Sequence, residues 1–447
     1  MKGKGLGVAS ESNLRSGEQG GAVHRFLKPI IDVRPAELRA LGWSWLYIIS
    51  VFISYYILRP IRDEMGVAGG VENLPWLFTG TLVGMMAVNP AFAALVSRLP
   101  RVKFIALSYR FFALNLLCFV ALLQLASGEQ GIWIGRLFFI WTSIFNLFVV
   151  SVFWALMVDV FDSEQGKRLF GFIAAGATVG GIMGSSLTAA LAKQVPAAYL
   201  LFASALLLEG AVFCVGRLSR LSSTLITKPT GQPEERAIGG SILSGLSHAL
   251  KSPYLVNVSI FLLLFAITST FLYFQQAEIA KKYFVDRGAR TAFFARVDLW
   301  VNVLTLGAQL FVTARTIKRI GVALTIALLP LLSIFGFGTL AWAPTIAVLV
   351  AFQVLRRAGN FAFARPTREV LFTVVTREDK YKAKSFIDTV VYRLGDQVGA
   401  WSYAGLGALG LAMTGVSVVA VPISVLWLLN SLWLGRKQKA LEAAAIA

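Results

Sequence analysis

The most telling stretch of the chain is ALGWSWLYIISVFISYYILRPIRD, residues 40–63. Its first part, 40–60, is apolar and long enough to cross a bilayer, which takes about 20 such residues in a helix. The span ends in a charged cluster that contains Arg59, Arg62 and Asp63. Charge near membrane depth costs about 2.5–3.5 kcal/mol per residue at a helix centre. We therefore expect this cluster to serve a polar pathway.

The rest of the chain repeats this apolar pattern. Of its 447 residues 57% are hydrophobic and 15% are charged, and its mean hydropathy is +0.70. No soluble domain of this size needs so much apolar surface, so the composition predicts an all-α integral membrane protein. We expect twelve transmembrane helices, at 40–60, 73–97, 103–126, 132–158, 169–192, 197–216, 254–276, 291–314, 320–341, 345–364, 384–410 and 412–434.

Basic residues are concentrated in alternate loops. The chain has 42 Lys and Arg against 23 Asp and Glu, a net charge of +19. Most of the basic residues lie in the N-terminal tail, at the C-terminus, and after the second, sixth, eighth and tenth spans, where Arg365 and Arg368 follow the tenth. The opposite loops are poor in Lys and Arg apart from 59–62 and 281–290. The positive-inside rule then predicts a multi-pass protein of the cell (inner) membrane with both termini in the cytoplasm. The excess charge therefore reflects topology, and we expect the lipid bilayer rather than nucleic acid as a partner.

The chain divides near its middle. We expect a largely disordered tail (1–38), an N-terminal six-helix bundle (39–216), a linker (217–252), a C-terminal six-helix bundle (253–434) and a second tail (435–447). Residues 97–101 resemble 314–318, which indicates a duplication. Two parallel six-helix repeats describe the major facilitator architecture, whose substrate site lies between the halves near the bilayer midplane.

Polar residues form stripes inside three spans of the second half. At about 100° per residue each set falls along one side of a helix. The stripes are Asp298, Asn302, Thr305 and Gln309 in the eighth span, Gln353, Arg357 and Asn360 with nearby Arg356 in the tenth, and Asp388, Tyr392 and Asp396 in the eleventh. In the eleventh, Arg393 can pair with Asp396 at i+3. The alternative is that such groups only hold helices together, for about 0.6 kcal/mol each.

Across all the predicted spans, arginines outnumber well-placed acids; they are Arg59, Arg62, Arg136, Arg356, Arg357 and Arg393. The planar guanidinium grips phosphate or carboxylate in two places, so the excess predicts an anionic small-molecule substrate. We expect substrate binding by Arg59, Arg62, Arg356, Arg357, Arg393, Asn302 and Asn360, and gating or coupling by Asp63, Glu278, Asp298, Asp388 and Asp396. The repeat offset of 216 residues places Glu278 opposite Arg62, which predicts a contact between these two at the outer mouth.

The fifth span carries Gly176, Gly180 and Gly184 at intervals of four. Such a ridge of small residues lets another helix approach closely. A phosphate-cradling loop is the alternative, but no Gly-Lys-Ser/Thr follows it. The sequence shows no metal-ligand cluster and no catalytic Cys/His pair, so we expect neither an enzyme nor a metal or cofactor.

Two motifs resemble a known family. Leu58-Arg59-x-x-Arg62-Asp63 resembles an element of the ATP/ADP transporters of plastids and obligate intracellular bacteria. Lys380-x-Lys382-x-Lys384-x-x-Ile387-Asp388, followed by Leu394-Gly395, resembles that family's element leading into span eleven. The resemblance implies a facilitator-like transporter of nucleotides or other phosphorylated anions, with Arg62 at a basic position important for transport. The family's lysine after Leu-Gly is Asp396 here, which should weaken affinity for a polyanion unless Arg393 compensates.

The leading hypothesis is a secondary transporter that moves an organic anion by alternating access, with ATP/ADP exchange as the first candidate. One alternative is a proton-coupled exporter of a lipophilic compound, which the aromatic content of 12% favours. A second alternative is a non-transporting membrane scaffold. A scaffold has no need of polar stripes in several spans, and it predicts that neutralising them leaves function intact.

Overall fold

The computed structural model describes residues 31–225, 250, 252–375, 383–384 and 386–446. Those residues form helices joined by short connections, and none of them lies in a strand. The all-α prediction is confirmed. Most of the predicted N-terminal tail and linker, together with Lys380 and Lys382 of the second motif, lie outside the described residues.

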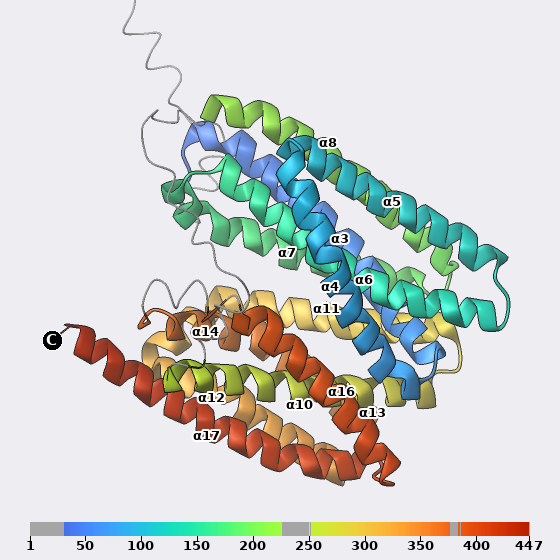
Figure 1. Cartoon of the computed structure of the whole chain (residues 1–447), viewed down its shortest axis with the longest axis vertical. Helices are drawn as coiled ribbons and strands as arrows, with labels where there is room; N and C mark the ends of the chain where they lie inside the picture. Colours follow the sequence, from blue (N-terminus) through green and yellow to red (C-terminus); the bar gives the residue numbers. More distant parts are fainter. Residues whose placement is uncertain (1–30, 226–249, 251, 376–382, 385, 447) are drawn as a thin grey trace, which may run out of the picture.

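The helices form two bundles, one above the other in Figure 1. The first contains α3 (Leu38–Ala68), α4 (Leu74–Arg98), α5 (Arg101–Leu125), α6 (Glu129–Val160), α7 (Ser163–Leu191) and α8 (Ala197–Leu225), with short turns η1 (Pro35–Glu37) and η2 (Val71–Asn73). The second contains α10 (Pro253–Tyr283), α11 (Arg287–Phe311), α12 (Thr313–Trp342), α13 (Ile346–Gly359), η3 (Asn360–Ala364), α14 (Arg365–Leu371), η4 (Ile387–Val391), α16 (Tyr392–Ala408) and α17 (Met413–Ile446).

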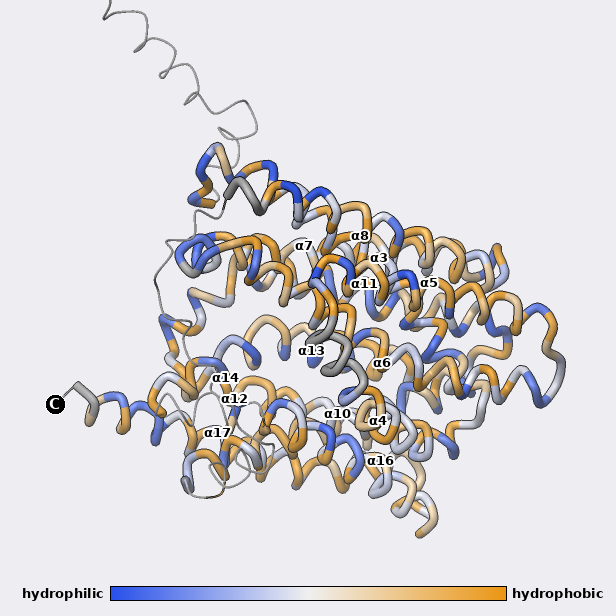
Figure 2. The backbone as a smooth tube through the Cα atoms, turned by 45° about the horizontal axis from the view of Figure 1, so that its top comes forward, coloured by the Kyte–Doolittle hydropathy of each residue, from blue (hydrophilic) through white to orange (hydrophobic). Residues whose placement is uncertain are grey.

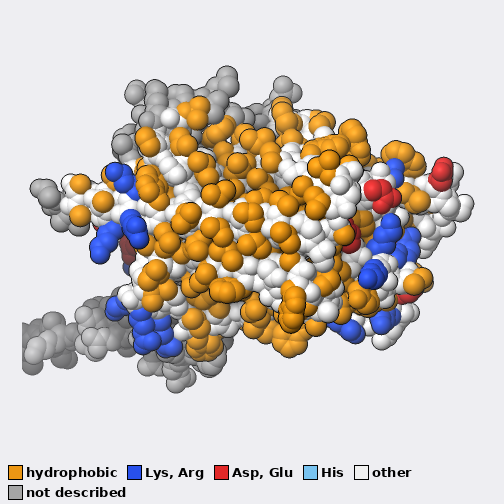
Figure 3. Space-filling model, turned by 90° about the horizontal axis from the view of Figure 1, so that it is seen from below, with side chains coloured by type: hydrophobic (Ala, Val, Ile, Leu, Met, Phe, Trp, Pro, Cys, Tyr) orange, Lys and Arg blue, Asp and Glu red, His pale blue; other side chains and the backbone are white. Residues whose placement is uncertain are grey.

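The helices, and the face seen in Figure 3, have the apolar character of a membrane protein. Within the described residues, nine helical segments are long and apolar enough to cross a membrane. Hydrophobic side chains cover the middle of the face seen in Figure 3, and charged side chains collect at its two ends. Figure 2 shows hydrophilic residues near many helix ends. The more polar helix α11 is not among the nine, and neither are α4 and α16. The total of twelve spans therefore stays a prediction.

Several helices run past the predicted ends of their spans, among them α8, which reaches Leu225, and α17, which reaches Ile446 where a tail was predicted. In the first and tenth spans the extension carries charged residues. The first span does not end at the charged cluster, because α3 continues through Pro60 to Ala68 and keeps Arg59, Arg62 and Asp63 inside the helix. The tenth span does not end before Arg365, because α14 extends it to Leu371. In both places the charged side chains lie against polar partners or rings of the protein, so the helix does not have to end where the charges begin.

The glycine ridge of α7 packs against α3, as predicted. A Cβ added at Gly180 would lie 2.8 Å from the backbone oxygen of Ile49, and one added at Gly184 would lie 2.7 Å from that of Ile53. Gly181 faces the other bundle instead, where a Cβ would lie 2.8 Å from the Asn302 side chain of α11. Small residues on α7 thus set two close approaches, one within its bundle and one between bundles.

This packing predicts a sharp difference between two glycines of the same helix. Gly180→Ala should destabilise the protein by roughly 1–3 kcal/mol, because its methyl group would press on backbone atoms of α3. Gly171→Ala is the matched control, since nothing lies within 4 Å of its added Cβ. Thermal unfolding in detergent measures both. Equal midpoints for the two variants would contradict close packing at Gly180.

Candidate functional site

A cavity of about 190 Å³ lies between the two bundles. Helices α3, α4 and α6 of the first bundle and α10 and α16 of the second supply its walls. Its lining residues are Arg62, Phe78, Thr81, Leu82, Phe139, Ser143, Ser269, Thr270, Tyr273, Tyr392, Arg393, Asp396 and Gln397. Cations, hydroxyl groups and aromatic rings therefore face the same space, as in a site for a charged organic ligand.

The first bundle contributes an arginine–aspartate pair to this cavity. Arg62 Nη2 lies 3.0 Å from Asp63 Oδ1 on the same helix. Tyr273 of the opposite bundle donates its hydroxyl to that carboxylate oxygen at 3.0 Å and lies 3.4 Å from Arg62 Nη2. The Arg62 guanidinium also stacks 4.4 Å from the centre of the Phe139 ring. Tyr273 thus connects the pair to the second bundle.

The second bundle contributes a matching pair. Arg393 Nη1 donates to Asp396 Oδ2 at 3.1 Å, which confirms the i+3 pairing expected from the sequence. Each bundle therefore presents one arginine to the cavity and holds a carboxylate beside it. An anion that enters must compete with Asp63 and Asp396 for the two guanidinium groups.

A second charged cluster joins the bundles through α11. The buried carboxylate of Asp298 lies 2.7 Å from Arg357 Nη1 of its own bundle and 3.5 Å from Arg59 Nη1 of the other. The predicted stripe on α11 faces inward at Asp298, Asn302 and Thr305, whereas Gln309 is exposed. Two arginines thus share one buried acid at the contact between the bundles.

Arg356, predicted to bind substrate, lies away from the cavity. Its side chain is 1% exposed and points into the second bundle, where it donates to Ser333 Oγ, Thr268 Oγ1 and the Phe265 oxygen. Arg356 and Arg357 are adjacent on α13, so a turn of about 100° separates the directions of their side chains. One therefore packs inside its own bundle while the other reaches Asp298.

The predicted contact between Arg62 and Glu278 is not formed. Glu278 accepts a hydrogen bond from the Tyr403 hydroxyl at 2.8 Å, and Arg62 pairs with Asp63. The repeat offset relates equivalent positions of the two bundles, but each of these side chains finds a partner within its own bundle.

Two more predicted residues lie elsewhere in the second bundle. Asp388 belongs to η4 and pairs with Arg368 at 3.1 Å, and Asn360 begins η3. Neither lines the cavity between the bundles. Their roles in gating and binding stay predictions.

The bundles are joined at the end where α3 finishes and α11 begins. Buried Glu64 of α3 accepts from Arg287 Nε at 3.0 Å and from Arg290 Nη2 at 2.9 Å. The ring of Trp76 on α4 lies 4.8 Å from that of Trp401 on α16. The sequence pattern did not predict this cluster, although the basic residues at 281–290, on the side otherwise poor in Lys and Arg, were a signal for it.

Comparison with known proteins finds transporters. ADP,ATP carrier protein 1 of Chlamydia trachomatis serovar D is 23% identical over 503 aligned positions, which cover 95% of this chain and 94% of that protein. ADP,ATP carrier protein 1 of Chlamydia muridarum is also 23% identical, and ADP,ATP carrier protein 2 of Chlamydia pneumoniae is 22% identical over 90% of this chain and 89% of its own. No family model matches the chain.

Solved structures with a similar fold are transporters of the major facilitator type. A bacterial homologue of the lysosomal transporter Spinster, inward-facing and unoccupied, has a TM-score of 0.59 at 13% identity and covers 91% of this chain and 99% of its own. An inward-facing bacterial homologue of ferroportin has a TM-score of 0.62 at 11% identity over 90% of this chain and 98% of its own. These likenesses show the fold.

Proposed function

We propose that the chain is a secondary transporter that moves an organic anion by alternating access, with exchange of ATP and ADP as the first candidate. The observation that carries the proposal is the cavity between the bundles, where Arg62 and Arg393 approach from opposite sides. Near full-length similarity to ADP,ATP carrier proteins supports nucleotides as the substrate class.

The cavity chemistry fits a nucleotide in two respects. A guanidinium group can donate two parallel hydrogen bonds to the oxygens of one phosphate. Aromatic rings such as those of Phe78 and Tyr273 offer faces on which a base can stack. At about 190 Å³ the cavity is smaller than the roughly 300–1,000 Å³ of typical ligand pockets. The bundles must therefore separate further around a whole nucleotide.

The contacts between bundles support a conformation closed at one end. Glu64 with its two arginines, and Trp76 with Trp401, lie at the end away from the start of α3 and the finish of α17. If both termini are cytoplasmic, as the loop charges predict, the closed end is the outer one. Transport then requires this end to open and the opposite end to close.

Uptake by proteoliposomes tests the proposal. Vesicles loaded with unlabelled ADP should accumulate labelled ATP or ADP, and Arg62→Ala should reduce uptake roughly tenfold or more, because a hydrogen bond to a charged group contributes about 1.5–3 kcal/mol. Arg110→Ala is the control, since Arg110 is exposed and pairs with Glu209 on the outside of the first bundle. Absence of nucleotide uptake, or full uptake by Arg62→Ala, would contradict the proposal.

The carboxylates beside the cavity are compatible with a second function, proton-coupled export. Asp63 and Asp396 lie next to the two arginines, where a proton-coupled exporter would carry its proton. Such an exporter predicts transport of a lipophilic compound that depends on a pH gradient and is abolished by Asp63→Asn. Nucleotide exchange that continues without a pH gradient excludes it.

A further inference from the structure

Two helical segments of the second bundle contain a π-helical turn. The turns are η3, Asn360–Ala364, in the tenth predicted span and η4, Ile387–Val391, in the eleventh. π-Helical turns are rare and frequently lie at functional sites. Arg365 directly follows η3, and Asp388 belongs to η4, so each turn carries or adjoins a charged side chain.

Arg365 differs from five other arginines of the helical segments in having no acidic partner within the part of the chain that the structure describes. Those others each have a carboxylate within ion-pair distance; they are Arg59, Arg62, Arg357, Arg368 and Arg393. Among the described residues Arg365 has none, and its guanidinium lies 4.7 Å from the centre of the Phe361 ring. The nearby carboxylate of Asp388 is 3.1 Å from Arg368 instead.

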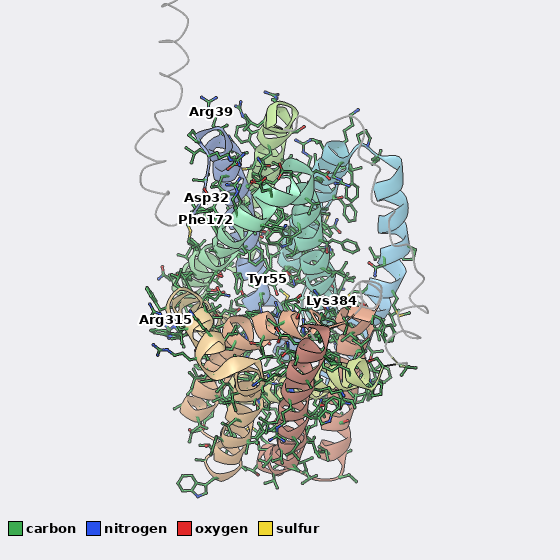
Figure 4. All side chains as sticks on the ribbon, turned by 90° about the vertical axis from the view of Figure 1, so that its left-hand side faces the viewer. Asp32, Arg39, Tyr55, Phe172, Arg315 and Lys384 are labelled. Carbon is green, nitrogen blue, oxygen red and sulfur yellow. The ribbon has the colours of Figure 1, made fainter. Side chains whose placement is uncertain are left out.

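The side chain of Arg365 is exposed although it belongs to a membrane-crossing segment, Ile346–Leu371. It lies within electrostatic range of Tyr392 and of Tyr56, which belongs to the first bundle. In Figure 4 Tyr55, the neighbour of Tyr56, and Lys384 lie where the two bundles face each other. Arg365 therefore lies near the contact between the bundles and within electrostatic range of Tyr392, which lines the cavity.

We propose that Arg365 is an additional anion-binding residue, the first to receive the phosphate or carboxylate group of a substrate arriving from the end with the termini. An unpaired arginine in a membrane segment is expensive unless a partner compensates its charge. Arg365 can bind an anion without displacing an aspartate, whereas Arg62 and Arg393 must release theirs. The anion would pass from Arg365 to the paired arginines of the cavity. This inference rests on the proposed transport function.

Sided transport assays test the order of binding. In vesicles of both orientations, Arg365→Gln should raise KM at least tenfold for nucleotide presented at the end with the termini, and change KM less than twofold at the opposite face. Arg365→Lys should recover part of the loss, since it restores the charge. Arg315→Gln is the control, because Arg315 is an exposed arginine of α12 bound to the Phe311 oxygen. An unchanged KM at the first face, or equal changes at both, would overturn the inference.

A binding measurement separates this inference from the proposed function. Pyrophosphate should raise the thermal unfolding midpoint of the purified wild-type protein, and Arg365→Gln should remove most of that shift without lowering the unliganded midpoint. Adenosine, which carries no phosphate, should affect both proteins equally. If the wild type transports no nucleotide yet the pyrophosphate shift depends on Arg365, the function fails and the anion site stands. If Arg365→Gln keeps the full shift, the anion site fails.

Discussion

Replacing Asp298 by asparagine is expected to lower the free energy of unfolding by about 3–5 kcal/mol, the usual result of removing one member of a buried ion pair. Its carboxylate is 2% exposed and serves Arg59 and Arg357 together. Without it, two largely buried cations face each other with no acid between them. The same change should abolish exchange. Asp298 joins Arg59 of the first bundle to Arg357 of the second, and alternating access depends on how the two bundles contact each other.

Unfolding in detergent and exchange in proteoliposomes measure the two effects separately. Asp159→Asn is the matched control, since Asp159 pairs with Arg101 at the surface and such exposed pairs contribute about 1 kcal/mol or less. The double variant Asp298→Asn with Arg357→Gln removes one charge of each sign and should recover part of the stability, because only Arg59 is then left without its acid. Recovery of exchange as well would show that the cluster is structural only.

Replacing Glu64 by glutamine is expected to weaken closure at the end where α3 meets α11. Arg290 is largely buried and Arg287 is about half exposed. The free energy that holds this end closed should therefore fall by a value between those for buried and exposed pairs, on the order of 2 kcal/mol. Since about 1.4 kcal/mol is a factor of ten, the population open at this end should rise roughly thirtyfold.

A cysteine placed at Ser269 in the cavity reports this opening, with Cys118 and Cys214 replaced by serine. An impermeant maleimide applied from the closed end should label it at least tenfold faster in Glu64→Gln. Glu72→Gln is the control, because Glu72 also pairs across the bundles, with Lys281 at 3.6 Å, but both side chains are exposed. Equal labelling of all three proteins would show that Glu64 does not hold this end closed.

Much of the architecture could be predicted from local pattern. Apolar runs predicted where along the sequence the helices lie. The glycines of α7 predicted a close helix contact, which the structure forms. The i+3 spacing of Arg393 and Asp396 predicted their ion pair, because both lie on one helix. The ends of the first and tenth spans were predicted wrongly, because hydropathy counts a charge as unfavourable whether or not the fold supplies a partner.

Residue pattern was enough to predict the membrane class, the two bundles and an excess of arginine inside the helices. Which arginines lie between the bundles depended on packing: Arg356 and Arg357 are adjacent on α13, yet one is enclosed by its own bundle and the other meets Asp298. Packing also paired Glu64 with Arg287, 223 residues away. Helical periodicity relates the side chains of one helix to each other, whereas only the association of the bundles determines what each face meets.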